Sequence, residues 1–291
     1  MTTKKTTITV KTTVGAPVEQ VWELWTTPRH IIRWNYASDD WHTPYAENDL
    51  RPGGRFLSRM AAKNGSAQFD FTGTYQAVDP YRLISYLIDD GRPVQLSFVA
   101  KGEETEITET FEAEQMHPVE IQQAGWQAIL DNFKKYAEAD GRPALLHFET
   151  TIGANAATVF HALFDEKMYN EWTTVFNPTS HFKGSWKKGS KMIFLGTGQD
   201  GKEGGMISRI RENIPNRFVS IEHVGIIEDG KEISSGPDVE RWAGALENYT
   251  LTENNEGTLL SVDMDAFPEW AAYFSETWPR ALEKLKTICE R

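Results

Sequence analysis

Alternating and helical spacings of apolar residues divide the start of the chain into a strand and two helices. Residues 8–14 place apolar side chains at every second position, which predicts a strand with one buried face. Gly15-Ala16-Pro17 ends this pattern, and Pro17 suits a first helical turn, where its missing N–H is not needed. Residues 18–25 then carry apolar side chains at helical spacing, so a short amphipathic helix is expected, followed by a second one over 30–34.

The following part of the chain predicts an antiparallel meander that a long helix closes. Residues 35–52 are polar with scattered aromatic side chains, and we expect a loop there. Short turns rich in Gly, Asn and Asp separate the next apolar stretches, so consecutive strands should be antiparallel. Strands are expected over 56–60, 69–77, 82–88, 94–100 and 105–114, and a helix with one apolar stripe is expected over 118–139.

The strand–helix pattern of the N-terminus occurs a second time. A shift of 138 positions places Gly15 on Gly153 within the same pattern, TTVGA in one copy and TTIGA in the other. Near the two ends, residues 125–133 match residues 277–285. A repeat of this length indicates two copies of a whole domain rather than an array of small units. We therefore predict domains over 1–140 and 144–291, with the boundary between Ala139 and Ala144.

Two features distinguish the second copy. Between the match of Arg82 with Arg217 and that of Trp126 with Trp278 it has gained 17 residues, and we assign them to the polar segment 225–244. The apolar residues of this segment need burial, so it is expected to form a lid or an extra edge over a second cavity. Pro279 lies inside the last predicted helix, over 268–290. Because proline removes a helical hydrogen bond and clashes with the preceding turn, a kink or a split is expected near 275–276.

Each copy is therefore an α+β domain in which one long helix covers one face of a sheet. A curved sheet around a helix leaves a hollow between them, which is a plausible ligand site on geometry alone. The 291 residues suffice for two such domains, and a hydrophobic content of 40% with 25% charged residues is typical of globular proteins.

Charge and cysteine content limit the classes of binding partner and the disulfide bonds that the chain can have. The chain has 42 acidic and 30 basic side chains, for a formal charge of −12, which argues against nucleic acid or an anionic membrane as partner. Cys289 is the single cysteine, so no intramolecular disulfide can form. The N-terminus lacks the apolar segment of a signal peptide, and no apolar run of 18 residues occurs. We expect a cytoplasmic protein.

The first copy resembles a known family. The runs that carry the resemblance are WHTPYAENDLRPGGRF (41–56), FDFTGTYQAVDP (69–80), DDGRPV (89–94) and QQAGWQAILDNFKKY (122–136). They are similar to the activators of heat-shock protein 90 ATPase, a family within the START-like (SRPBCC, birch-pollen-allergen-like) superfamily. The resemblance covers nearly all of the first copy and is weaker in the second, where Gly189 alone remains of the glycine pair.

The resemblance implies two helix-grip domains, each a curved antiparallel sheet around a long C-terminal helix, with two short helices after the first strand. It implies a central cavity but no fixed catalytic residue. It also implies a chaperone partner and a role in stress response. The co-chaperone members carry a separate N-terminal domain that contacts the chaperone, whereas this chain has a second cavity domain in its place.

Three polar segments could carry chemistry, and a structural role is favoured for each. Asp49–Phe56, DLRPGGRF, is expected to be a tight turn rather than a phosphate cradle, because no helix follows it. Asp39, Asp40 and His42 lack a second group of ligands at zinc-site spacing. His223 and Glu222 are adjacent in a predicted strand and should face opposite sides of the sheet. No hydrolase or dinucleotide motif occurs, so we predict no catalytic residue, cofactor or metal.

The aromatic residues are the stronger signal, and they leave two interpretations. They either fill the cores or line the hollow between sheet and helix. Residues proposed for a first cavity are Trp34, Trp41, Tyr45, Phe56, Phe71, Tyr75, Tyr86, Phe98, Gly125, Trp126 and Ile129. Those proposed for a second cavity are Trp172, Phe176, Phe194, His223, Trp242 and Trp278.

The function expected from these observations is non-catalytic binding of a small hydrophobic or aromatic molecule. We expect the ligand in the first copy, between its sheet and the helix over 118–139. One alternative is a protein-interaction module that binds a chaperone. A further alternative is a cyclase- or hydrolase-type enzyme that uses the same cavity.

Overall fold

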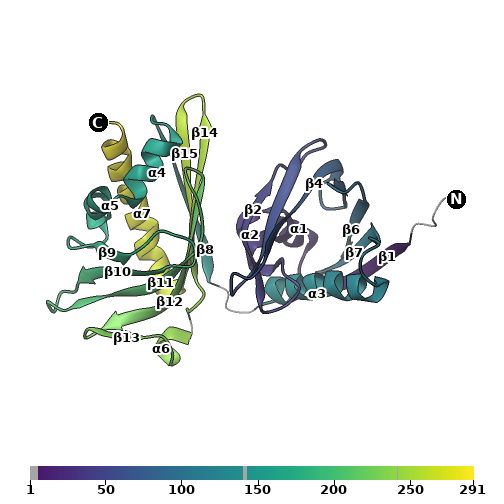
Figure 1. Ribbon diagram of the computed structural model, residues 1–291, viewed down its shortest axis with the longest axis horizontal. Helices are drawn as coiled ribbons and strands as arrows, with labels where there is room; N and C mark the ends of the chain where they lie inside the picture. The colour runs from purple at the N-terminus through teal and green to yellow at the C-terminus, as the bar shows by residue number, and fades with distance from the viewer. Residues whose placement is uncertain (1–5, 140–142, 241) are drawn as a thin grey trace. The chain divides into compact units, whose positions relative to one another are not determined.

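The computed structural model describes residues 6–139, 143–240 and 242–291. The chain divides into two compact units, Met1–Gly141 and Arg142–Arg291. Within the predicted linker, residues 140–142 lie outside the described residues. Each unit is an α+β helix-grip domain with a curved antiparallel sheet and one long helix (Figure 1). The fold class predicted from the sequence is therefore confirmed.

The first domain forms a seven-stranded sheet in the order β1-β7-β6-β5-β4-β3-β2. Its elements are β1 (Thr7–Val14), α1 (Val18–Thr26), α2 (Pro28–Trp34), β2 (Trp41–Asn48), β3 (Arg55–Ala62), β4 (Gln68–Asp79), β5 (Leu83–Ile88), β6 (Pro93–Lys101), β7 (Glu104–Glu112) and α3 (Val119–Ala137). The meander predicted after residue 56 is present as β3 to β7, because short turns join strands that pair with their neighbours in sequence.

The second domain repeats this order, with the main path β8-β15-β14-β12-β11-β10-β9. Its elements are β8 (Ala144–Ile152), α4 (Ala156–Phe164), α5 (Glu166–Trp172), the 3-10 turn η1 (Thr173–Val175), β9 (His181–Gly184), β10 (Lys191–Thr197), β11 (Glu203–Ile214), β12 (Phe218–Glu228), β13 (Lys231–Ile233), α6 (Pro237–Glu240), β14 (Leu246–Asn254), β15 (Gly257–Ala266) and α7 (Pro268–Cys289).

One contact explains why the repeated glycine is kept in both copies. The backbone N–H of Gly15 donates to Glu138 Oε1 at 2.6 Å, and that of Gly153 donates to Glu290 Oε1 at 2.7 Å. A Cβ atom at either glycine would lie 3.2 Å from the same carboxylate oxygen. The glycine therefore lets the end of the long helix bind the turn that follows the first strand.

The segment predicted as a loop over 35–52 contains strand β2, so this prediction is wrong in its central part. Thr43, Pro44, Tyr45 and Ala46 are all buried, although the segment is polar overall. β2 is the edge strand beside β3, and the pairing is irregular between His42 and Tyr45. A proline fits this position because an edge strand leaves one row of N–H groups unpaired.

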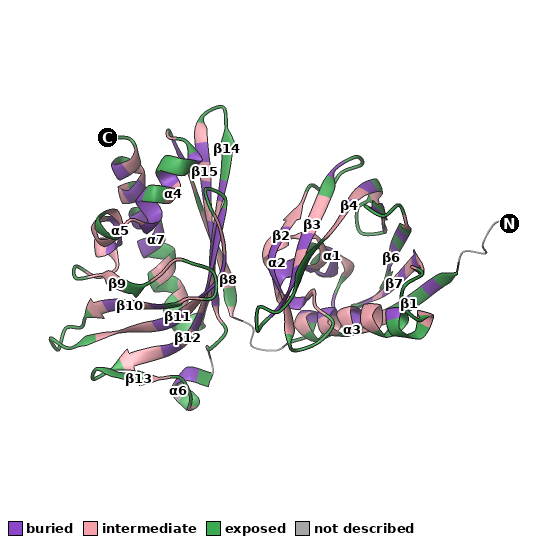
Figure 2. Ribbon diagram, viewed as in Figure 1, coloured by how far each residue is buried: buried purple, intermediate pink, exposed green. Residues whose placement is uncertain are grey.

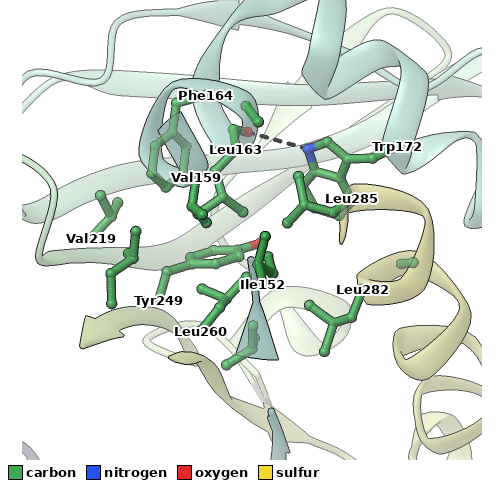
Figure 3. Close-up of a cluster of buried hydrophobic side chains, with 14 of the residues drawn as sticks. Ile152, Val159, Leu163, Phe164, Trp172, Val219, Tyr249, Leu260, Leu282 and Leu285 are labelled. Carbon is green, nitrogen blue, oxygen red and sulfur yellow. Dashed lines mark hydrogen bonds between the residues drawn. The ribbon is translucent and has the colours of Figure 1, made fainter. Parts of the chain in front are cut away.

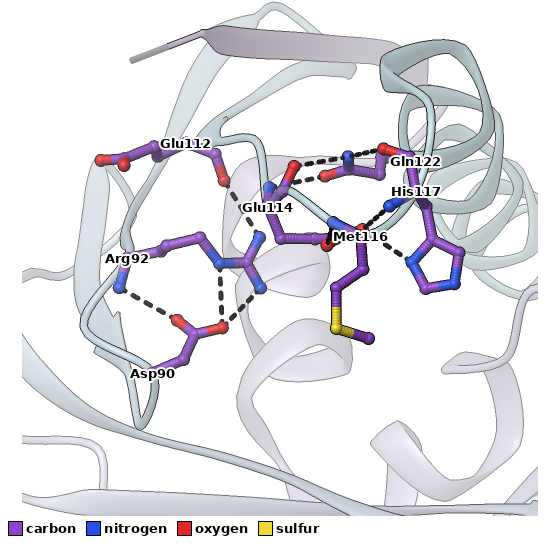
Figure 4. A network of polar contacts seen from close by, with 7 residues as sticks. All are labelled: Asp90, Arg92, Glu112, Glu114, Met116, His117 and Gln122. Atoms are coloured by element: carbon purple, nitrogen blue, oxygen red, sulfur yellow. Dashed lines mark hydrogen bonds and ion pairs between the residues drawn. The ribbon is translucent and has the colours of Figure 1, made fainter. Parts of the chain in front are cut away.

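Helix α3 is held at its start by side chains rather than by a cap (Figure 4). The Gln122 amide donates to the carbonyl oxygens of Glu114 at 3.1 Å and His117 at 2.8 Å, and it accepts from the Glu114 N–H. Further along the helix, Leu130 and Phe133 are fully buried on the face toward the core. Figure 2 shows this one-sided burial along both long helices.

The core of the second domain lies under the C-terminal half of α7 (Figure 3). Leu282 and Leu285 pack there with Ile152 and Leu260. The helix runs unbroken through Pro279, so the predicted split is wrong, and the alternative, a kink near 275–276, stays a prediction. Pro279 is exposed while Trp278 and Ala281 beside it are buried. Trp278 before the proline and Ala281 after it pack on the same core, which keeps the helix continuous in spite of the missing hydrogen bond.

Residues 225–244 add an edge to the second sheet, which is one of the two forms expected for this segment. β13 pairs with the end of β12, with Ile226 opposite Ile233, and α6 follows. Ile226, Ile227 and Trp242 are partly buried. Within the described residues, no helix is long and apolar enough to cross a membrane.

Candidate functional site

The first domain encloses a cavity of about 70 Å³ between its short helices and its sheet. Its lining residues are Trp25, Thr26, Ile31, Trp34, Asn35, Glu47, Asn48, Phe56, Ser58, Tyr75, Ile84 and Tyr86. Cavities that hold drug-sized ligands usually measure about 300–1,000 Å³. This cavity is therefore too small for the aromatic ligand expected in the first copy, and α3 does not line it.

Ring packing explains why so little space remains. Trp126 stacks on Phe111 with ring centroids 3.9 Å apart, and Phe71 meets it edge-on at 6.0 Å. Phe98 packs edge-on against Trp22 and Trp25. Such stacked and edge-to-face contacts are the favoured arrangements of aromatic pairs. These contacts favour the interpretation that the rings pack against one another, which is the other of the two that the sequence left open.

The remaining residues predicted for the first cavity do not form a wall either. Trp41 lies against Phe69 with centroids 5.9 Å apart, and the buried Tyr45 donates to a carboxylate two residues along its own strand. Gly125 and Ile129 are partly exposed on α3. A Cβ atom at Gly125 would meet no heavy atom within 4 Å. Of the predicted set, Trp34, Phe56, Tyr75 and Tyr86 line the small cavity.

A buried carboxyl group lies in the core of this domain. Glu109 on β7 is 4% exposed, and the Tyr86 hydroxyl donates to its Oε1 at 3.4 Å. Burial raises the pKa of Glu109 to about 8, and the bond from Tyr86 offsets a small part of that rise. The Tyr75 hydroxyl donates to Asn48 Oδ1 at 2.6 Å, and burial raises the pKa of Tyr75 well above the usual value.

The second domain contains a much larger cavity, with a volume of about 540 Å³. Its walls are aromatic and its polar groups are few. The lining consists of Tyr169, Trp172, Thr173, Phe176, Ser180, Trp186, Phe194, Met206, Ile221, His223, Ile226, Trp242, Ala245, Glu247, Tyr249, Met264, Asp265, Phe267, Glu269, Trp270, Tyr273, Phe274 and Trp278. This volume and this lining are typical of small-molecule sites.

The longer closing helix helps to build this cavity. α7 extends ten residues before Trp278, whereas α3 extends seven before Trp126. Trp270, Tyr273 and Phe274 in this N-terminal half line the cavity, and the first two are 54% and 41% exposed at its border. Trp242, from the segment that the first copy lacks, adds a further wall.

Three polar residues of the lining, His223, Glu247 and Tyr249, lie on the neighbouring strands β12 and β14. His223 Nδ1 is 2.8 Å from Ser208 Oγ, and His223 Nε2 is 3.8 Å from Glu247 Oε2. The Tyr249 hydroxyl donates to Glu247 Oε1. Burial, followed by the negative charge of Glu247, raises the pKa of Tyr249 and of Tyr169 well above the usual value.

Ser208, His223 and Glu247 have the composition of a hydrolytic triad but not its accessibility. Ser208 is fully buried and does not line the cavity, so its hydroxyl cannot reach a bound molecule. Glu222 forms an ion pair with Arg209 at 2.6 Å, while His223 belongs to the cavity lining. The two neighbours therefore face opposite sides of the sheet, as the strand pattern predicted.

All six residues proposed for the second cavity belong to its lining. Sequence reasoning missed the polar group formed by Glu247, Tyr249 and Tyr169. A weak signal was present, because Glu247 and Tyr249 are two residues apart and must share a face of any strand. The sequence could not show which face of this strand points into the cavity, because that depends on the neighbouring strands.

The two loop segments that were considered for chemistry have structural roles. Gly53 has a φ of 79°, and a Cβ at Gly54 would lie 2.0 Å from the Asp49 carbonyl oxygen, so a tight turn requires this pair. Asp40 accepts from the Ser38 hydroxyl at 2.6 Å. In the described part of the chain, no group of three or more His, Cys, Asp or Glu side chains is placed to hold a metal ion.

Solved structures place this fold among known proteins. The di-domain ARO/CYC StfQ from the steffimycin biosynthetic pathway is 12% identical over 97% of this chain and 98% of its own, with a TM-score of 0.57. The di-domain ARO/CYC BexL from the BE-7585A biosynthetic pathway is 12% identical over 98% and 99%, with a TM-score of 0.53. At this identity the likeness shows a shared two-domain fold.

The first domain has a closer match in sequence. The AHSA1-like protein from Aeromonas hydrophila, solved by NMR, is 48% identical over 46% of this chain and 92% of its own, with a TM-score of 0.44. No curated protein matches the chain at a significant level. The family model described as "Activator of Hsp90 ATPase homolog 1-like protein" matches residues 15–138 and again 153–290. Both domains match, and the chain therefore belongs to the family of activator of Hsp90 ATPase homolog 1-like proteins.

Proposed function

We propose that the second domain binds a small, largely apolar aromatic molecule in its cavity without changing it chemically. The observation that supports this function is the cavity of about 540 Å³ with aromatic walls. Ser208, whose hydroxyl lies 2.8 Å from the imidazole of His223, is fully buried and is therefore not accessible as a nucleophile from the cavity. The sequence favoured the first copy for this role. We propose the second domain instead, because the cavity of about 70 Å³ in the first domain is too small for such a ligand.

The expected affinity is moderate. A ligand that buries about 200 Å² of apolar surface gains about 5 kcal/mol from that burial. The loss of translational and rotational freedom and the ordering of wall side chains oppose this gain. Additional stacking on the tryptophan rings contributes about 0.5–1.5 kcal/mol for each good pair. A dissociation constant no lower than the micromolar range is therefore expected.

The test replaces each of two alanines by phenylalanine in the full chain. Ala245 lines the cavity, whereas Ala243, two residues before it, is exposed. Isothermal titration with naphthalene derivatives, steroids and aromatic acids should identify compounds that bind the wild type. Ala245→Phe should weaken their binding at least tenfold, and Ala243→Phe should leave it unchanged. If no compound binds, or if Ala245→Phe binds as well as the wild type, the proposal is lost.

The family favours a second candidate, a chaperone-associated interaction module. The observation behind it is the match of both domains to the family of Hsp90 ATPase activator homologues. In that case the chain should stimulate the ATPase of a heat-shock protein 90. Stimulation should fall as salt is raised, if the contact depends on exposed charges. A chain that binds small molecules but leaves ATP turnover unchanged at every salt concentration would exclude this candidate.

A further inference from the structure

We propose that the cavity of the second domain recognises a neutral hydroxyl group, which lies between His223 Nε2 and Glu247 Oε2. The ligand class is then an alcohol or phenol carried on an aromatic or alicyclic skeleton. This inference rests on the proposed binding function and specifies which molecules the cavity selects. It is carried by the hydrogen-bond geometry of Ser208, His223, Glu247 and Tyr249.

The tautomer of His223 follows from the burial of Ser208. Ser208 is 0% exposed, and among the described residues its Oγ lies within hydrogen-bond distance of His223 Nδ1, at 2.8 Å. If Nδ1 carried the proton, the buried serine hydrogen would have no acceptor in this group, which costs more than an oxygen that accepts nothing further. Ser208 therefore donates to Nδ1. The imidazole proton is then on Nε2, which faces the cavity.

The acceptor is Glu247 Oε2. The other oxygen of this carboxylate already accepts from the Tyr249 hydroxyl, which orients the group. Oε2 lies 3.8 Å from His223 Nε2, beyond the length of a hydrogen bond. Both residues line the cavity. The cavity therefore presents one donor and one acceptor that are close together and do not bond directly to each other.

A hydroxyl oxygen fits this pair. At about 2.8 Å from both atoms, it would lie about 2 Å to one side of the line that joins them. It would accept from Nε2–H and donate to Oε2, which completes a chain of hydrogen bonds from Ser208 to Tyr249. An ether can accept but cannot donate, and an ammonium group can donate but cannot accept. A carboxylate cannot donate and is repelled by Glu247.

The probes are naphthalenes that differ in one substituent. Full-length protein is titrated calorimetrically at neutral pH with 2-naphthol, 2-methoxynaphthalene, 2-naphthoate, 2-(aminomethyl)naphthalene and 2-naphthamide. We expect 2-naphthol to bind at least tenfold more tightly than each of the others. Equal affinity for 2-naphthol and 2-methoxynaphthalene, with loss of both in Ala245→Phe, overturns the hydroxyl site but keeps the cavity. Tightest binding of the amide or of a charged probe also overturns it, and binding of none of the probes removes the proposed function itself.

Variants test the assigned roles through the ratio of the two dissociation constants, methoxynaphthalene over naphthol. A general loss of stability does not change this ratio. Glu247→Leu should bring it close to one, and Ser208→Ala should lower it several-fold because His223 then exchanges tautomers. Ser220→Ala is the matched control, since Ser220 is equally buried and does not line the cavity. An unchanged ratio in Glu247→Leu contradicts the proposal.

A measurement on the wild-type protein tests the tautomer of His223 directly. Proton–nitrogen correlation spectra of the histidine rings distinguish a protonated Nε2 from a protonated Nδ1. The resonance assigned to His223, through its absence in His223→Phe, should show a proton on Nε2 and none on Nδ1. A proton on Nδ1, alone or together with one on Nε2, would overturn the inference, whatever the titrations give.

Discussion

Replacing Glu109 by glutamine should make the first domain more stable, and increasingly so as the pH rises. Glu109 is 4% exposed in the core, where burial raises its pKa from 4.5 to about 8. Between these two values the folded domain holds a proton that the unfolded chain has released. By linkage, stability then decreases with increasing pH in this window, because the native state binds more protons than the unfolded state.

The magnitude follows from the size of the shift. One pKa unit corresponds to about 1.4 kcal/mol, so the full cost of ionising buried Glu109 is about 5 kcal/mol above pH 8. The same relation gives a cost of about 1 kcal/mol at pH 5.5, about 3 kcal/mol at pH 7 and almost none below pH 4.5. Glutamine has a similar shape, can still accept from Tyr86 and does not ionise. Glu109→Gln should therefore exceed the wild type by a margin that grows by about 3 kcal/mol from pH 5.5 to pH 8.

Urea unfolding of the full chain from pH 5.5 to pH 8, fitted as two transitions, measures this margin for the first domain. The matched control is Glu104→Gln, an exposed position on the same strand, which should show a margin that is small and independent of pH. A margin for Glu109→Gln that stays constant, or that shrinks as the pH rises, would refute the argument. The buried carboxyl group would then have a lower pKa than its surroundings indicate.

Three further substitutions test the packing of the two long helices by urea unfolding. Gly125→Ala should stabilise the first domain by about 1 kcal/mol, because alanine is the better helix former and a Cβ there meets no heavy atom within 4 Å; a loss of stability would show that this side of α3 is crowded. Pro279→Ala should stabilise the second domain by about 1–3 kcal/mol, since it restores an N–H inside an unbroken helix, and no gain would mean that the helix is not continuous in solution. Leu285→Ala should destabilise the second domain by about 2–5 kcal/mol because Leu285 is fully buried in its core, and a loss below about 1 kcal/mol would contradict that placement.

Local patterns were sufficient for most of the fold. The alternation in residues 8–14, the helical spacing in 18–25 and the shift that places Gly15 on Gly153 predicted two copies of one α+β domain. These signals are readable because the period of apolar positions depends on nearby residues alone. β2 was missed for the opposite reason. Its residues Thr43 and Tyr45 are buried by tertiary contacts in a segment whose composition is polar.

The location of the cavity was decided by tertiary structure. The sequence showed an excess of aromatic residues in both copies, and nothing in their spacing separates a ring that stacks on another from a ring that borders empty space. Trp126 and Trp278 are equivalent positions, yet Trp126 stacks on Phe111 and does not line the cavity of about 70 Å³ in its domain, while Trp278 lines a cavity of about 540 Å³. The empty volume inside a domain depends on how all the side chains of its core pack together. No single stretch of sequence determines that packing.

The polar site inside that cavity depended on tertiary structure for the same reason. Ser208, His223 and Glu247 come from β11, β12 and β14, and the register of these strands brings them together. A one-residue change of register would turn each side chain to the other face of the sheet. The sequence by itself determined which residues could form such a group and that two domains would hold them. Only the pairing of the strands decided that the three meet, because hydrogen bonds between residues far apart in the chain determine that register.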